Sequence, residues 1–315
     1  MDPTGVVAAS TVITGIIYVL VRVHRARERR MDRVWEDAAR AVRGKFVLGE
    51  AGATRMLSVT SDGADLLADE YQVGKYRYSR ICVGVPNSMG LELSVKRYGV
   101  FETIGKALDA LDSTGDAPFD DEFATEASNR DIGRLWLHAP VRTAIRASGD
   151  WTFSLSRGTL TLIRPSASMP EDSAALARAV RSALVVARRG AELEREWAAL
   201  ASELDGIVVK PFDVSRAELG AITIARGGAE ARVSVRRAEQ GVQTSVSAEA
   251  NTAIDDASWE PLRKRAQAAG AQTMRLESGR VTVEARGILL DAPALRELLS
   301  VLAVAIAVPT LGPYR

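Results

Sequence analysis

Cysteine and histidine are scarce in this 315-residue chain, and their scarcity excludes several kinds of site. The single cysteine, Cys82, cannot form an intrachain disulfide, which rules out a secreted domain built on disulfides. The two histidines, His24 and His138, cannot complete a Cys/His zinc cluster within one chain. We therefore expect neither a metal site nor a disulfide framework.

A strong net charge is also missing. The chain has 41 Lys and Arg against 40 Asp and Glu, a net charge of +1. Part of the positive charge is concentrated at 22–33, so the rest of the chain is slightly acidic. A slightly acidic body lacks the general attraction to phosphate on which nucleic-acid binding depends. We expect no nucleic-acid partner.

Sequence motifs of common enzymes are absent. The chain contains no nucleophile elbow, no zinc-protease helix, no calcium loop and no dinucleotide fingerprint after a strand. Gly74-Lys75 lacks both the first glycine and the hydroxyl residue of a phosphate-binding loop. No catalytic, cofactor-binding or metal-binding residue is assigned, and no cofactor is expected.

What the sequence does contain begins with an uncharged run over residues 3–21. As a helix this run would be about 28 Å long, close to the thickness of a bilayer's hydrocarbon core. Small residues four apart, such as Gly5 and Ala9, would permit close packing of two such helices. The run predicts a single transmembrane anchor at 1–23.

A basic segment at 24–33 follows the predicted anchor. Positive charge on the C-terminal side places the following body in the cytoplasm, which indicates a single-pass protein of the bacterial inner membrane. Membrane would then be one partner, with arginines near the lipid headgroups. These arginines are Arg22, Arg25, Arg27, Arg29, Arg30 and Arg33.

The remaining chain repeats one pattern. Trp35 and Gly44 precede the apolar triplet 46–48, and Trp197 and Gly206, with the same nine-residue gap, precede a second apolar triplet. Each set predicts a helix that ends at glycine and a strand that starts there.

Two β-hairpins extend the repeat. Residues 149–163 align without a gap with residues 270–284, and each block reads as strand, glycine turn and strand, followed by a helix. We predict an α+β fold with two tandem copies of a unit made of helix, antiparallel sheet, helix, β-hairpin and helix. The copies span 34–190 and 191–315, with an insertion at about 98–130 in the first. Gly190 either lies within one long connecting helix or ends a helix at an elbow.

An acidic cluster lies within the predicted insertion. It could hold a divalent ion or provide a carboxylate pair for acid–base catalysis, but carboxylates beside a proline are also common helix caps. Capping is the preferred interpretation, and Asp255-Asp256 has a similar setting in the second copy. The cluster consists of Asp116, Asp120, Asp121 and Glu122.

His138 and Cys82 remain as candidates for nucleophilic chemistry. His138 precedes Ala139-Pro140 at a predicted helix start, where a structural histidine is expected. Cys82 lies in an apolar strand, where a buried, inert thiol is expected.

Aromatic and basic residues alternate in one segment, 71–80. Strand geometry places Tyr76 and Tyr78 on one face and Arg77 on the other, which suits contact with a partner as well as a half-buried strand. The mixed residues are Tyr71, Lys75, Tyr76, Arg77, Tyr78 and Arg80.

These observations favour a non-enzymatic interaction or assembly module with a protein partner or a homo-oligomeric state. Two similar surfaces on one tether suit bivalent binding. The alternative is a carboxylate-dependent hydrolase or transferase that uses the acidic cluster around Asp120.

Overall fold

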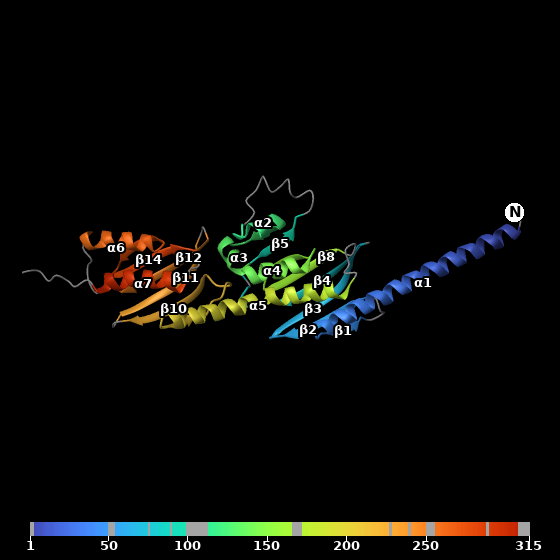
Figure 1. Cartoon of the computed structure of the whole chain (residues 1–315), viewed down its shortest axis with the longest axis horizontal. Helices are drawn as coiled ribbons and strands as arrows, with labels where there is room; N and C mark the ends of the chain where they lie inside the picture. The colour runs from blue at the N-terminus through green and yellow to red at the C-terminus, as the bar shows by residue number, and fades with distance from the viewer. Residues whose placement is uncertain are drawn as a thin grey trace, which may run out of the picture. The chain divides into compact units, whose positions relative to one another are not determined.

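The computed structural model (Figure 1) describes most of the chain. The described ranges are 3–49, 54–74, 76–88, 90–98, 113–165, 172–226, 229–238, 241–249, 256–287 and 290–307. The helices are α1 (Pro3–Ala41), α2 (Ala117–Glu122), α3 (Arg130–Trp136), α4 (Ala139–Ser148), α5 (Ser173–Glu203), α6 (Asp256–Ala268) and α7 (Ala292–Ala307). The strands are β1 (Lys45–Leu48), β2 (Arg55–Ser61), β3 (Ala64–Val73), β4 (Tyr76–Gly84), β5 (Leu93–Arg97), β6 (Phe123–Ala127), β7 (Thr152–Ser156), β8 (Thr159–Pro165), β9 (Gly206–Lys210), β10 (Glu218–Arg226), β11 (Ala229–Ala238), β12 (Gly241–Glu249), β13 (Ala271–Glu277) and β14 (Arg280–Arg286).

The strands form two antiparallel sheets, which confirms the predicted α+β class. The larger sheet has the order β1-β2-β3-β4-β8-β7-β5-β6, and the smaller has the order β13-β14-β12-β11-β10-β9. The chain divides into two compact units. The first unit contains residues 1–83, 145–151 and 162–184, and the second contains 84–144, 152–161 and 185–315.

The two sheets share a strand order. Four consecutive strands form a meander in each, and a later hairpin adds to the fourth strand through its second strand, β8 or β14. The larger sheet has β5 and β6 in addition, near the predicted insertion, of which residues 99–112 lie outside the described range. This order agrees with a duplication, and the predicted copy boundaries at 34, 190 and 191 stay a prediction.

The two predicted hairpins are confirmed, and their turns explain their sequences. Arg157 and Gly158 have φ of 51° and 76°, and Ser278 and Gly279 have φ of 50° and 76°. Positive φ at both central positions is the two-residue turn that matches the twist of paired strands, and glycine adopts it without strain. Each glycine therefore lies in the turn between the two strands of its hairpin, and the short turn fixes the register in which those strands pair.

The predicted helix-to-strand junctions have the same geometry in both places. Arg43 and Asp205, the residues before the two glycines, have φ of 56° and 55°. A Cβ at Gly44 would lie 2.6 Å from Ser58 O, and a Cβ at Gly206 would lie 2.7 Å from the Ile222 side chain. The glycines therefore let each helix end directly against the second strand of its sheet. The preceding tryptophans, Trp35 and Trp197, are fully buried, as expected of core residues.

Gly190 lies inside α5, which settles the two alternatives in favour of one continuous helix. A Cβ at this position would lie 2.2 Å from Pro86 O and 3.3 Å from Trp136 Cη2. A glycine is needed because the backbone of the 85–88 loop packs directly on the helix.

The predicted transmembrane anchor at 1–23 is wrong. Within the described ranges, no helix combines the length and the apolar character needed to cross a bilayer. The uncharged run is part of α1, which continues past residue 23 to Ala41 as one helix and packs on β1 and β2. The sequence interpretation treated the run as a separate element and so misjudged the helix to which it belongs.

The predictions that depended on the anchor fail with it. The segment 24–33 is the middle of α1 and not a juxtamembrane stretch. Lipid headgroups as partners of its five arginines and of Arg22 are therefore not supported. Arg22 lies over the Tyr18 ring at 5.5 Å, and Arg33 Nε donates to Arg29 O at 3.4 Å, so both contact the helix itself. The predicted single-pass location in a bacterial inner membrane, with a cytoplasmic body, is likewise not supported.

Candidate interaction surface

Side chains of β3 and β4 form an exposed aromatic and apolar surface within the first unit. The strand register pairs Val73 with Tyr76 and Tyr71 with Tyr78, so these four side chains share one face of the sheet. We call this surface the tyrosine face. Its members are Leu67, Asp69, Tyr71, Val73, Tyr76, Tyr78 and Arg80.

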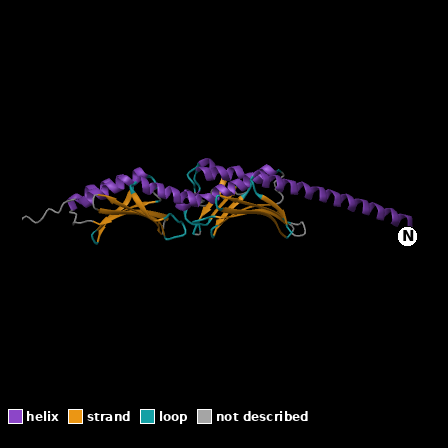
Figure 2. Cartoon of the chain, turned by 90° about the horizontal axis from the view of Figure 1, so that it is seen from below, coloured by secondary structure: helices purple, strands orange, loops and turns teal. Residues whose placement is uncertain are grey.

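The tyrosine face is open to solvent. Val73 and Tyr76 are each 57% exposed, and Leu67 is 38% exposed. In Figure 2 the helices lie on one side of the strands and leave the other side bare. Adjacent large apolar side chains in this state mark binding surfaces more often than isolated exposed residues do.

The polar members of the tyrosine face are held in fixed positions. The Tyr71 and Tyr78 rings stack with centroids 5.3 Å apart, and the Arg80 guanidinium lies 4.9 Å from the Tyr71 centroid. Arg80 also donates to both carboxylate oxygens of Asp69, at 2.6 and 3.0 Å. Burial raises the pKa of Tyr71, and Arg80 opposes that change only in part, so the phenol stays protonated at neutral pH.

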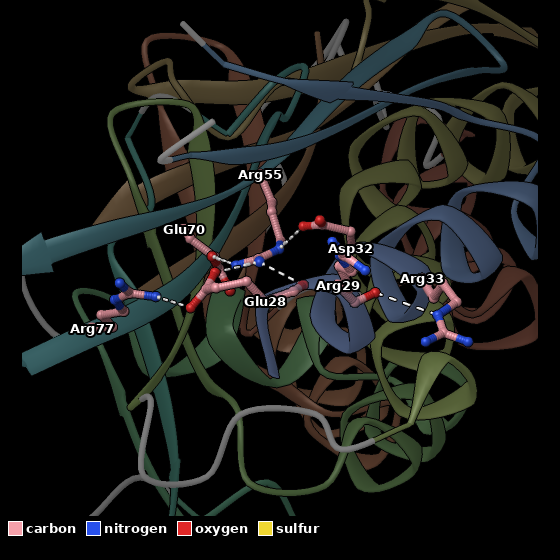
Figure 3. A network of polar contacts seen from close by, with 7 residues as sticks. All are labelled: Glu28, Arg29, Asp32, Arg33, Arg55, Glu70 and Arg77. Atoms are coloured by element: carbon pink, nitrogen blue, oxygen red, sulfur yellow. Dashed lines mark hydrogen bonds and ion pairs between the residues drawn. The ribbon is translucent and has the colours of Figure 1, made fainter. Parts of the chain in front are cut away.

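The opposite face of the same strands carries a buried ion network (Figure 3). The Arg55 side chain, 3% exposed, donates to Glu28 Oε2 at 2.6 Å, Asp32 Oδ1 at 2.8 Å and Glu70 Oε2 at 2.8 Å. Arg77 reaches Glu28 from β4 at 3.3 Å. The network joins α1 to β2 and β3, so α1 covers this face and the tyrosine face is the one presented.

The predicted division of segment 71–80 is confirmed. Tyr76 and Tyr78 lie on the tyrosine face, and Arg77 points to the face covered by α1. Lys75 lies outside the described residues. Leu67, Asp69 and Val73 were missed, although the register of a β3–β4 hairpin would have placed them opposite Cys82, Arg80 and Tyr76.

The acidic cluster is arranged as a helix cap. Asp116 Oδ1 accepts from Phe119 N at 3.2 Å, and its Oδ2 accepts from Arg142 Nε at 2.8 Å. Glu122 pairs with Arg97 at 2.9 Å, and the Asp121 side chain lies at the surface. Within the described ranges, no group of His, Cys, Asp or Glu side chains could hold a metal ion. Asp255 and the Asp256 side chain, which belong to the predicted second copy, lie outside the described part.

Asp120, the central residue of the cluster, has an environment that suits an anion. Burial alone would raise its pKa, but hydrogen bonds from Thr114 and Ser113 outweigh burial and lower the pKa below its ordinary value of 3.8. A general acid requires the opposite shift. The contacts favour a structural role for Asp120.

This environment predicts an acid-dependent loss of stability. Because the folded pKa of Asp120 is lowered, its stabilisation is present above pH 3.8 and is lost as the pH falls through the folded value. We expect Asp120→Asn to lower the free energy of unfolding by about 1 kcal/mol at pH 7, and this difference from wild type to vanish at strongly acidic pH. Urea unfolding at both pH values measures this, with Glu126→Gln, at an exposed carboxylate of β6, as the control. A cost that is independent of pH would contradict the assignment.

His138 and Cys82 lie in different compact units. His138 Nε2 lies 3.6 Å from Glu192 Oε2, while burial, followed by the charge of Arg189, lowers its pKa so that the imidazole is neutral at pH 7. Cys82 is half-buried, so the expectation of a buried thiol was wrong. In the strand register it lies opposite Leu67.

Comparisons of the chain with protein-family models, with curated proteins and with solved structures give no match.

Proposed function

We propose that this chain is a non-enzymatic interaction module that binds a protein partner through the tyrosine face. The observation that supports this most directly is the exposure of Val73 and Tyr76 beside the stacked pair of Tyr71 and Tyr78. Tyrosine and arginine are enriched in the centres of protein interfaces because they combine large apolar area with polar ends.

The side chains of the tyrosine face are restrained before any partner binds, and this favours binding. The Asp69–Arg80 ion pair and the contact between Arg80 and the Tyr71 ring already restrict these side chains in the free protein. A partner then loses less affinity to side-chain ordering than it would on a mobile surface. The tyrosine face therefore resembles a preorganised binding site.

The acidic residues support the non-enzymatic part of the proposal. The carboxylates of Asp116 and Asp120 accept hydrogen bonds from backbone and side-chain donors around α2, and the pKa of Asp120 is lowered. Carboxylates bound in this way stabilise the start of α2 and the loop before it, which favours a structural role over a catalytic one.

Replacing Tyr76 with lysine tests the proposal. We expect Tyr76→Lys to reduce partner recovery at least tenfold, because it removes exposed aromatic area and adds a charge at the interface. Folding stability should change by less than about 0.5 kcal/mol, since Tyr76 is exposed. Affinity purification of the full chain with quantitative mass spectrometry measures the recovery.

Gln72→Lys is the matched control. Gln72 lies on the same hairpin, opposite Arg77, and is exposed on the other side of the strand. Equal loss of a partner in both variants, or no loss in Tyr76→Lys, would count against the tyrosine face.

A further inference from the structure

Strand β9 is an outer strand of the smaller sheet and presents apolar side chains. Its recorded pairing is with β10, so within the described chain the other edge of β9 has no strand beside it. Ile207 is 75% exposed and Val209 is 50% exposed. An exposed edge of this kind is a template for pairing with another strand.

The opposite edge of the same sheet is protected in the usual way. Strand β13 presents Gln272, Arg275 and Glu277 to solvent. Charged residues on an edge strand discourage pairing between molecules. In contrast, β9 has one charged residue, Lys210, and its ammonium group is bound to Glu218 of β10. Glu218 also accepts from Arg232 at 2.9 Å, so Lys210 is drawn onto its own sheet.

We propose that two copies of this chain associate by antiparallel pairing of their β9 strands about a two-fold axis. In the register centred on Val208, Ile207 of one copy lies opposite the partner's Val209. Lys210 lies opposite the partner's Gly206, which has no side chain to displace the contact between Lys210 and Glu218. The two six-stranded sheets would become one continuous sheet.

Charge selects a second β9 over the other apolar edge of the protein. Strand β1, which also exposes Val47 and Leu48, has Lys45 at its start, whereas β9 has Lys210 at its end. Antiparallel pairing of β1 with β9 would bring the two lysines to the same end, and like charges at close range are unfavourable. Pairing β9 with β9 places the two Lys210 residues at opposite ends.

The pairing is independent of the tyrosine face, which belongs to the other unit. Analytical ultracentrifugation of the full chain tests it. We expect the wild type to reach twice its 33.8 kDa mass with rising concentration, and Ile207→Lys to raise the dissociation constant at least tenfold. Gln272→Lys and Tyr76→Lys should leave the association unchanged.

A second variant keeps the test informative if Ile207→Lys fails to fold. In a Cys82→Ser background, Val208→Cys should give a covalent dimer with a short bifunctional thiol reagent, because the two copies of this residue face each other across the axis. Gln272→Cys in the same background should not. A monomeric wild type, or equal crosslinking from both positions, would overturn the proposal.

Discussion

Replacing Arg55 with methionine should lower the free energy of unfolding of the first unit by about 3 to 5 kcal/mol. The Arg55 side chain is 3% exposed and pairs with Glu70, whose side chain is 4% exposed. Loss of the guanidinium leaves the Glu70 charge buried without the one ion pair recorded for it in the described chain, and it removes the link to Glu28 and Asp32 on α1. Denaturation followed through the tryptophan fluorescence of the chain, to which Trp35, buried on α1, contributes, measures the change.

Two further variants separate the buried charge from simple loss of contact. Arg77→Met removes an ion pair from a 44% exposed arginine, so we expect a change of less than about 1 kcal/mol. The double variant Arg55→Met with Glu70→Met should be more stable than Arg55→Met alone, because it no longer contains the buried Glu70 carboxylate without its partner. An Arg55→Met protein as stable as Arg77→Met would show that the network does not hold α1 on the sheet.

Gly190→Ala should destabilise the second unit, although alanine is the better helix former. The added Cβ would lie 2.2 Å from Pro86 O, a backbone atom that cannot move without shifting the 85–88 loop. Overpacking of this kind typically lowers the free energy of unfolding by about 1–3 kcal/mol, while alanine gains about 1 kcal/mol in helix propensity. We therefore expect a net loss of about 1 kcal/mol, and of about 2 kcal/mol at most. Trp136, 3.3 Å from the added atom, reports the local change by fluorescence.

Gly84→Ala is the control for the helix substitution. A Cβ at Gly84 would meet nothing within 4 Å. The free energy of unfolding of this variant should therefore lie within about 0.5 kcal/mol of the wild-type value. A stabilised Gly190→Ala protein would mean that the 85–88 loop does not pack on α5 as described.

Local structure could be predicted where a few neighbouring residues determine it. The turns at Gly158 and Gly279 depend on positive φ, and the junctions at Gly44 and Gly206 depend on the absence of a side chain. Each requirement leaves a glycine at a recognisable place between apolar segments. This is why the hairpins and the helix-to-strand junctions were found from the sequence.

The interpretation of α1 failed because it rested on composition alone. The arginines at 22–33 were read as a boundary, whereas α1 runs through them. Glu28 and Asp32, which look like interruptions of a basic segment, are partners of a buried Arg55 that lies 23 to 27 residues later. Pairings across such distances depend on the tertiary fold, and no periodicity in the sequence points to them.

The tyrosine face was predictable in part. Alternation placed Tyr76 and Tyr78 on one side of a strand, but which side was covered depended on where α1 packs. Leu67 and Val73 join the face through the register of β3 with β4, and no pattern in the sequence of these strands specifies that register.

Photo-crosslinking from position 76 in the source cells tests the central claim, binding at the tyrosine face, most directly. A photoreactive phenylalanine in place of Tyr76 should give a discrete adduct with a partner, and the same group at Gln72 should not. Val73→Lys, next to the crosslinking group on the same face, should abolish the adduct. Equal products from positions 76 and 72, or no product from position 76, would contradict the account.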